Sequence, residues 1–137
     1  MTLGITDRSI TPAEVEASVA GPDAGAVVTF AGLVRDATHG RRVLRLEYEA
    51  YAPMAERVFA ALITEARSRW PILRVAISHR VGVLQIGEVA VAIAVASAHR
   101  AEAFEACRFL IAAIKAQAPI WKREVFEDGS EWAQCHP

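Results

Sequence analysis

Lysine is almost absent from this sequence. Thirteen of its 15 Lys and Arg residues are arginine, and the only two lysines, Lys115 and Lys122, lie seven positions apart on either side of Pro119-Ile120-Trp121. A desolvated ammonium group can lose its proton and act as an acid, a base or a nucleophile, whereas a guanidinium stays charged. The absence of lysine elsewhere makes this pair the first candidate for a reactive site.

The chain also has few cysteines, almost no net charge and no long apolar run. Two cysteines, Cys107 and Cys135, do not make a disulfide framework and suit a reducing compartment. A net charge of −1 argues against a nucleic-acid partner, so any anion site must be local. The longest apolar run, VAVAIAVAS from Val89, is about half of a membrane span, and the N-terminal residues lack a signal-peptide pattern. We therefore expect a cytoplasmic protein that binds neither nucleic acid nor membrane.

Familiar motifs of metal and nucleotide sites are missing too. The histidines and cysteines lack metal-ligand spacing, and no P-loop, GxGxxG turn or GxSxG elbow occurs. We therefore expect no metal and no cofactor. The carboxylates Glu47, Glu49 and Glu124 have no spacing that requires paired acid–base chemistry. Cys107 lies in an apolar helical pattern, where packing is the favoured role.

What is present predicts a compact α+β domain. With 137 residues and a hydrophobic fraction of 53%, the chain can bury a core as one domain over residues 1–137. Helical periods predict three helices, which start at Thr11 and span 53–70 and 99–116. Alternating or continuous apolar patterns predict strands at 3–6, 25–35, 43–51, 73–78, 89–97, 120–126 and around Trp132. The mixture of hairpins and helices predicts a mixed or antiparallel sheet. We expect a mobile loop at 36–42 and a tail at 133–137.

Local signals predict the ends and faces of these elements. Thr11 and Glu14 predict a capping box, Ser97 an N-cap for the third helix, and residues 79–88 a bent connection hinged at Gly82 and Gly87. The alanines of the strand 89–97 predict a face that a helix or a second subunit can approach closely. The predicted buried faces are Leu44, Leu46, Tyr48 and Ala50; Met54, Val58, Leu62 and Ala66; and Phe104, Cys107, Ile111 and Ile114.

Cationic residues gather at three of these boundaries. Arg35 follows a strand, His99-Arg100 open the third helix, and Lys115 lies near its end. A helix N-terminus beside His and Arg is a natural site for a phosphate or carboxylate. Fifteen residues at about 1.5 Å each separate Arg100 from Lys115 by roughly 22 Å. Either they contact different ends of an extended substrate, or a dimer brings one chain's helix start to the other chain's lysines.

Pro119 and Trp121 stand between the lysines. They could form an apolar wall that lowers a lysine pKa. For Trp121, an ordinary place in the core is the favoured interpretation.

Several blocks of this sequence resemble one known family. TFAGLVR, LEYEAY with Met54, EARSRW, SHRVGVLQIGE, SAHRAEAFEA and PIWKRE occur in order between Gly25 and Trp132. Together they are similar to the catalytic (large) subunit of molybdopterin synthase, the MoaE family. The resemblance implies an α/β-hammerhead fold. It also implies a homodimer that carries a small ubiquitin-like sulfur-carrier subunit, ending in Gly-Gly, at each outer end to form a heterotetramer.

The resemblance also implies a reaction and a set of residues. Cyclic pyranopterin monophosphate would receive two sulfurs from the carrier's C-terminal thiocarboxylate to form the molybdopterin dithiolene. Lys115 and Lys122 match the catalytic positions. The residues that match substrate-binding positions are Phe30, Arg35, His99 and Arg100. Two alternatives stay open: a non-catalytic dimeric module that docks a carrier's tail, and an unrelated lysine-dependent enzyme acting on a phosphorylated carbonyl compound.

Overall fold

The computed structural model of the chain describes residues 4–135. Its elements in chain order are β1 (Gly4–Thr6), α1 (Pro12–Val19), β2 (Ala26–Leu33), β3 (Ala37–Thr38), β4 (Arg41–Ala50), α2 (Ala52–Arg69), β5 (Ile72–Arg80), β6 (Gly82–Gln85), β7 (Val89–Ser97), α3 (Arg100–Gln117), β8 (Ile120–Phe126) and β9 (Glu131–Cys135). The predicted α+β class with three helices is confirmed. Leu3 of the predicted first strand and residues 136–137 of the predicted tail lie outside the described residues.

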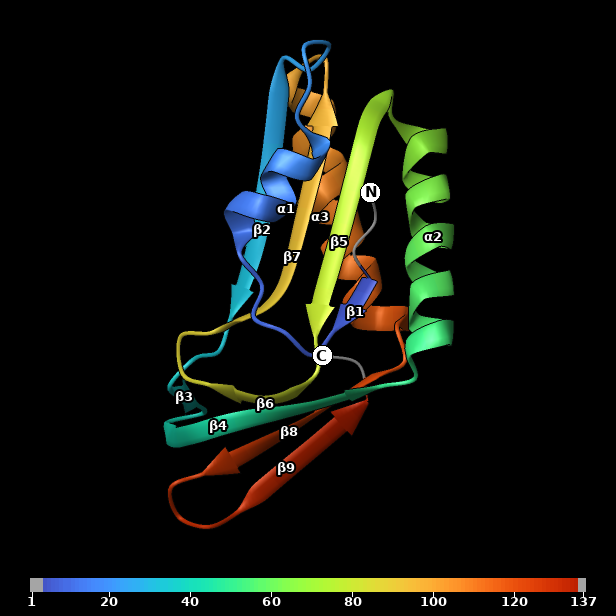
Figure 1. The fold of residues 1–137 in the computed structure, drawn as a ribbon. Helices are drawn as coiled ribbons and strands as arrows, with labels where there is room; N and C mark the ends of the chain where they lie inside the picture. Colours follow the sequence, from blue (N-terminus) through green and yellow to red (C-terminus); the bar gives the residue numbers. More distant parts are fainter. Residues whose placement is uncertain (1–3, 136–137) are drawn as a thin grey trace.

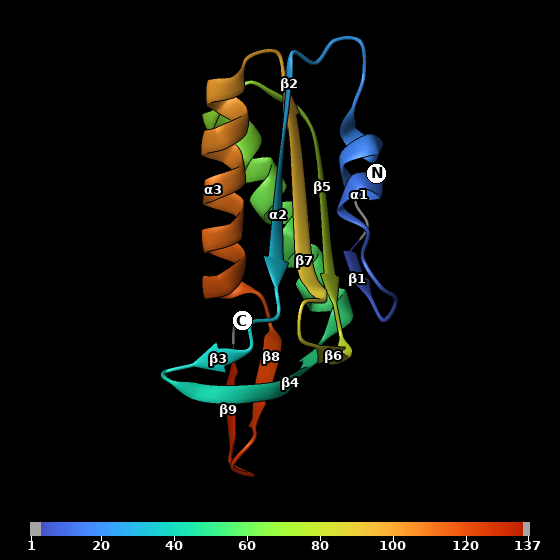
Figure 2. The same cartoon turned by 90° about the vertical axis from the view of Figure 1, so that its left-hand side faces the viewer.

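The main sheet has the strand order β1-β5-β7-β2. β1 runs parallel to β5, and the other neighbours are antiparallel, so the sheet is mixed as predicted. Helix α1 covers one face of this sheet, while α2 and α3 lie side by side on the other (Figures 1 and 2). The larger hydrophobic core fills the space beneath α2 and α3, and a smaller core lies beneath α1.

Strand β7 is the centre of this sheet because it pairs on both sides, with β5 and with β2. Its larger side chains, such as Ile93 and Val95, point into the larger core. Its other face packs against Val15 and Val19 of α1. The residues of that face in the smaller core are Ala92, Ala94 and Ala96. The prediction that the alanine face accepts a close neighbour is confirmed, and the neighbour is α1.

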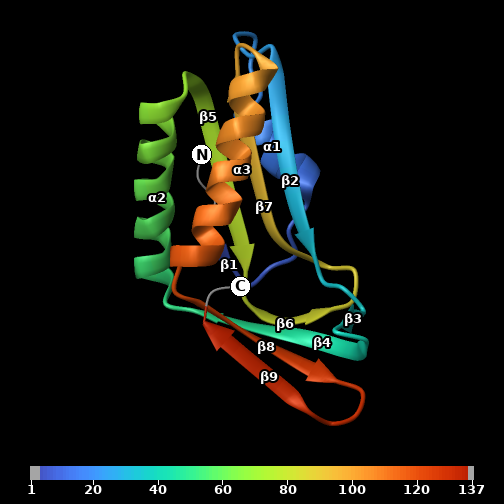
Figure 3. The ribbon, with the colours of Figure 1, turned by 180° about the vertical axis from the view of Figure 1, so that it is seen from behind.

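A second sheet lies across the base of the first (Figure 3). Its order is β3-β4-β8-β9, and β6 pairs with β4 along the opposite edge from β8. Two of these strands were not predicted. Residues 79–88, expected as a bent connection, continue β5 to Arg80 and then form β6. The positive φ angles of Gly82 and Gly87 do confirm the two hinges.

The segment 36–42, expected as a loop, contains a short hairpin. Ala37 and Thr38 of β3 pair with Arg42 and Arg41 of β4, and residues 39–40 turn the chain with positive φ angles of 51° and 75°. Glycine takes such angles readily, which explains why position 40 favours the reversal. Two paired residues are too few to produce an alternating pattern, so the strand left no signal in the sequence.

The predicted N-cap Thr11 is confirmed, but the predicted capping box and the predicted N-cap Ser97 are wrong. Thr11 is the N-cap of α1, but its side chain makes no capping bond, because the amide of Glu14 donates to the Thr11 carbonyl instead. Helix α3 has His99 rather than Ser97 as its N-cap. Ser97 still belongs to β7, and its hydroxyl donates to the carbonyl of His99.

The predicted buried faces are correct in part. In α2, Leu62 and Ala66 are buried but Met54 is 46% exposed, because Ala55 and Phe59 take the inward positions. In α3, Cys107 and Ile114 are buried whereas Phe104 is 59% exposed. In β4, a register shift between Val43 and Arg45 buries Val43 and leaves Leu44 outside. A bulge of this kind reverses the alternation at one point of a strand.

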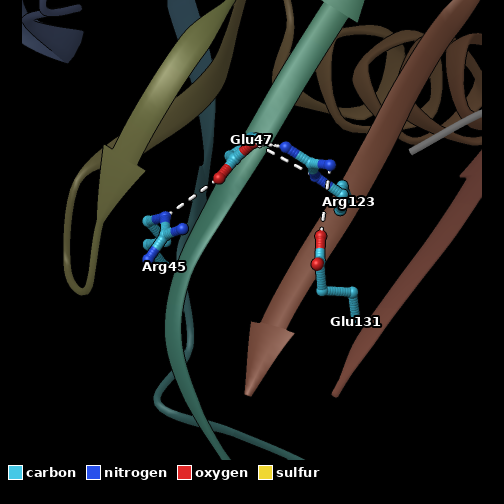
Figure 4. A network of polar contacts seen from close by, with 4 residues as sticks. All are labelled: Arg45, Glu47, Arg123 and Glu131. Atoms are coloured by element: carbon cyan, nitrogen blue, oxygen red, sulfur yellow. Dashed lines mark hydrogen bonds and ion pairs between the residues drawn. The ribbon is translucent and has the colours of Figure 1, made fainter. Parts of the chain in front are cut away.

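Charged residues tie the strands of the second sheet together on its outer face. Glu47 of β4 accepts hydrogen bonds from Arg45, at 2.9 Å, and from Arg123 of β8, which also pairs with Glu131 of β9 at 3.1 Å (Figure 4). The bonds from Arg123 and Arg45 lower the pKa of Glu47. This network joins three adjacent strands and leaves the inner face free for other side chains.

Candidate active site

A cavity of about 330 Å³ lies where the inner face of the second sheet meets the end of the main sheet and the last turns of α3. Four of the six predicted site residues line it: Phe30, Arg35, Lys115 and Lys122. They come from β2, from the segment after it, from α3 and from β8. The two lysines of the chain therefore share one cavity, although they belong to different elements.

Lys122 reaches this cavity because of the alternation of β8. Ile120, Lys122 and Glu124 point inward, and Tyr48 of β4 lies directly opposite Lys122 in the strand register. The Lys122 ammonium lies 3.6 Å from one oxygen of Glu124. The other Glu124 oxygen accepts a hydrogen bond of 2.7 Å from the hydroxyl of Thr38 in β3. The Glu124 side chain, only 3% exposed, is thus held from two sides.

The surroundings of Lys122 lower its pKa. Burial lowers the pKa of Lys122 below the usual 10.5, and the charges of Lys115 and Arg35 lower it further, while Glu124 raises it. Burial disfavours a charged amine because water no longer solvates it. The side chain of Lys122 is 16% exposed, so it remains within reach of a ligand in the cavity. Neither Pro119 nor Trp121 lines the cavity, so the apolar wall expected from them is wrong.

Trp121 does not form that wall, and its predicted place in the core is wrong. It alternates with Lys122, so it lies on the outer face of the second sheet and is 44% exposed. The cavity's apolar lining comes instead from other strands and from α3. These residues include Leu46, Tyr48, Ala90, Val91, Ile111 and Ile114.

Lys115 and Arg35 bring two further positive charges to the cavity. Lys115 lies in the last turn of α3, just before the helix ends at Gln117, and Arg35 follows the end of β2. Both residues are exposed, and both affect the pKa of Lys122. Three cations around one cavity that contains a single carboxylate, Glu124, make an anion the natural ligand.

Four polar residues of the cavity were not predicted as site residues: Thr38, Tyr48, His79 and Glu124. Burial raises the pKa of Tyr48 to about 12, with a contribution from the Glu124 charge, and lowers the pKa of His79 to about 4. The two rings meet edge to face, with centroids 5.1 Å apart. For Glu124, the two-residue spacing from Lys122 on a strand was a usable signal, because residues i and i+2 share a face.

His99 and Arg100 do not line this cavity. They stand at the opposite end of α3 from Lys115, and both are exposed. The predicted separation along the helix is therefore present within one chain. Between residues 4 and 135 no cluster of three or more His, Cys, Asp or Glu residues could hold a metal ion. The same residues contain no helix long and apolar enough to span a membrane.

Cys107 packs in the core. The residue is 4% exposed, and burial raises the pKa of its thiol to about 11. A thiol of this kind stays protonated and unreactive at neutral pH.

Comparison with known proteins places the chain in one family. The model of the family described as "MoaE protein" matches residues 5–117. The chain belongs to the MoaE family. Curated relatives named molybdopterin synthase catalytic subunit occur in Thermoplasma volcanium (49% identical over 126 residues, 92% of each chain) and Bacillus subtilis (48% over 128 residues, 93% of this chain and 82% of the relative). A relative with the same name in Arabidopsis thaliana is 49% identical over 116 residues, and there the chain spans only 59% of the relative's length.

Solved structures of MoaE relatives have the same fold. The molybdopterin synthase structure from Staphylococcus aureus has a TM-score of 0.91 and 41% identity, covering 97% of this chain and 96% of that one. The MoaE protein from Burkholderia ambifaria has a TM-score of 0.78 and 34% identity, covering 96% and 87%. A complex of subunits 1 and 2 of the molybdopterin-converting factor from Helicobacter pylori, at 20% identity and a TM-score of 0.78, shows the fold alone.

Proposed function

We propose that this chain is the catalytic subunit of a molybdopterin synthase. It transfers sulfur from the C-terminal thiocarboxylate of a small carrier protein to cyclic pyranopterin monophosphate, forming the dithiolene of molybdopterin. The observation that carries the proposal is the convergence of Lys115, Lys122 and Arg35 on one cavity in a member of the MoaE family. The relatives' shared name supports the same activity.

The charges of the cavity suit this reaction. The cyclic phosphate and the thiocarboxylate are both anionic, and three cations compensate for them where water is partly excluded. Arg35 binds the phosphate, because a guanidinium can donate two hydrogen bonds to its oxygens. Phe30, half-buried in the wall, packs against the flat pterin ring.

The two lysines take different parts. Lys122, whose pKa is lowered by burial, is held in place by Glu124 and orients the substrate or the carrier's tail. Lys115 is more exposed and stands at the rim, where the thiocarboxylate enters, so it transfers the proton or stabilises the developing charge. Neither step requires a metal or a cofactor from this chain.

A second copy of the chain completes the site. β2 is an edge strand of the main sheet, and its last residue, Leu33, is 57% exposed. An apolar edge of this kind is normally covered in the working protein. In the homodimer, His99 and Arg100 of one copy approach the lysine cavity of the other and bind the anionic substrate. With one carrier on each copy, the assembly is a cytoplasmic heterotetramer.

The proposal is tested by reconstitution. Purified protein is mixed with cyclic pyranopterin monophosphate and a small carrier bearing a Gly-Gly thiocarboxylate, and dithiolene formation is followed. Product and a tight complex with the carrier are expected. If neither appears, the proposed function is wrong.

Lys115→Ala separates catalysis from mere docking, with Arg108→Ala, an exposed position on the same helix, as the control. Loss of turnover with unchanged carrier affinity supports an enzyme. Loss of affinity alone supports a docking module, and a borohydride-trapped adduct on either lysine supports a Schiff-base enzyme instead.

A further inference from the structure

His79 is a buried polar residue that the proposed reaction does not yet use. It lies near the end of β5, is 1% exposed and lines the cavity that contains both lysines. Histidine is not the residue expected in a well-packed strand, since an apolar residue of similar size would fill the space without a polar atom to satisfy. Its presence in the wall therefore requires a reason.

The contacts of His79 fix its orientation and its tautomer. Nδ1 lies 2.9 Å from the carbonyl oxygen of Arg80, and a carbonyl can only accept, so Nδ1 carries the proton. The edge-to-face contact with Tyr48, at an interplanar angle of 73°, also restrains the ring. In a neutral ring Nε2 is then an acceptor, and no described residue donates a hydrogen bond to it.

The charged neighbour of this acceptor is Lys115. It lines the same cavity from α3, and its positive charge contributes to the lowered pKa of His79. The other ionisable groups that line the cavity are Arg35, Tyr48, Lys122 and Glu124. Of these, Tyr48 is in edge-to-face contact with the ring, and Lys122 is paired with Glu124. The cation whose charge acts on His79 is Lys115 rather than Arg35. Lys115 is the donor that remains for Nε2.

We propose that His79 is a positioning residue for Lys115: its Nε2 accepts a hydrogen bond from the Lys115 ammonium and draws it from the exposed rim into the cavity. This inference rests on the proposed function, in which Lys115 acts on the sulfur-transfer step. Burial supports the role, because it keeps the ring neutral near neutral pH and so able to accept. A protonated ring would add a fourth cation to the cavity and repel Lys115.

Two substitutions separate the acceptor from the packing. His79→Leu fills a similar space without an acceptor, whereas His79→Gln places an amide oxygen near the position of Nε2. Loss of a hydrogen bond from a charged group predicts that His79→Leu lowers kcat about 10- to 100-fold and changes KM by less than about threefold. His79→Gln is expected to regain most of the rate. A kcat for His79→Leu within about threefold of wild type, or equal losses in both variants, would overturn the inference.

A second readout does not depend on activity. Because the chain has only two lysines, ¹⁵N-lysine labelling gives two side-chain signals, which Lys115→Arg and Lys122→Arg assign. At low temperature, the Nζ protons of Lys115 are expected to exchange with water at least about threefold faster in His79→Leu than in wild type or His79→Gln, since the hydrogen bond protects them. Equal exchange in all three proteins contradicts the inference even if the wild type makes product. If the wild type makes none, the proposed function fails while the exchange rates still decide the role of His79.

Discussion

Glu124 shows how one carboxylate can organise the candidate site. It is nearly buried, and its two oxygens have different partners, the ammonium of Lys122 and the hydroxyl of Thr38. It therefore links β3 to β8 and fixes the position of a lysine whose pKa is already lowered by burial. In the sequence Glu124 has no carboxylate at a spacing that predicts paired acid–base chemistry, whereas the structure pairs it with a cation.

Glu124→Gln is predicted to disable Lys122 without unfolding the protein. The amide removes the negative charge that raises the Lys122 pKa, so that pKa falls further. The single-turnover rate of dithiolene formation is expected to drop about tenfold or more. The pKa is measured from the ¹³Cε signal of Lys122. Glu49→Gln, an exposed residue on the outer face, is the control and is expected to change neither quantity. An unchanged rate in Glu124→Gln would show that Glu124 does not contribute to the reaction.

His79 makes stability depend on pH in a defined range. Its pKa is about 4 in the folded chain and about 6.5 in the unfolded chain, so the unfolded state binds more protons between these values. Stability is therefore complete above pH 6.5 and decreases as the pH falls toward 4. Because of this group, the free energy of unfolding is predicted to fall by about 2 to 3 kcal/mol between pH 7 and pH 4.5. Urea unfolding of wild type and His79→Gln at both pH values measures the difference, and parallel losses in the two proteins would contradict it.

Single residues were also where sequence patterns failed. Trp121 is apolar and large, yet strand alternation places it outside because Lys122 occupies the inward position. Phe104 fits a helical stripe but is exposed, since the small residues Ala103 and Ala106 lie against the sheet. The size and polarity of a residue suggest whether it is buried. Which residues of a helix or strand face inward is decided by the rotation of the helix or the register of the strand.

At the scale of elements, the long and regular ones were predictable. β7 and α3 have strong periodic patterns, and both were placed within about two residues. β3 and β6 were not, because their two and four residues form strands only through pairing with β4. Long-range pairing of this kind leaves no local signal. One of the two missed strands, β3, contributes Thr38 to the cavity, which explains why this residue escaped notice.

The alanine face of β7 predicts a sharp size limit. Ala94 is fully buried against α1, so Ala94→Leu overpacks the smaller core and is expected to lower the free energy of unfolding by about 1 to 3 kcal/mol. Ala133→Leu in β9, an exposed position, serves as the control, with a change within about 0.5 kcal/mol. Urea denaturation measures both. If the two variants are equally stable, α1 does not pack closely against Ala94 of β7.

At the scale of the whole molecule, helix α3 carries candidate residues at both ends. Lys115 belongs to the cavity, whereas Arg100 lies one helix length away. The sequence could predict this separation from helix geometry, and it could not predict which copy supplies each group. If a site combines Lys115 of one copy with Arg100 of the other, two inactive variants can repair each other.

Mixed dimers of Lys115→Ala and Arg100→Ala are predicted to regain activity. In a dimer with one copy of each variant, one site has both substitutions and the other has neither, so about half of the wild-type activity per mixed dimer returns. Co-expression with two affinity tags isolates the mixed dimer for the assay. Activity no higher than that of either variant alone would show that Lys115 and Arg100 do not act together across the dimer.

The central claim is that the cavity shared by Lys115 and Lys122 is where the substrate reacts, and the two lysines offer the most direct measurement. Labelling with ¹³Cε-lysine places probes in this cavity and, because the chain has no other lysine, nowhere else. Titration with cyclic pyranopterin monophosphate is predicted to shift both signals together with one saturating curve, and Arg35→Ala is predicted to weaken that curve. Full synthesis of the dithiolene with neither lysine signal moved by substrate would contradict the claim.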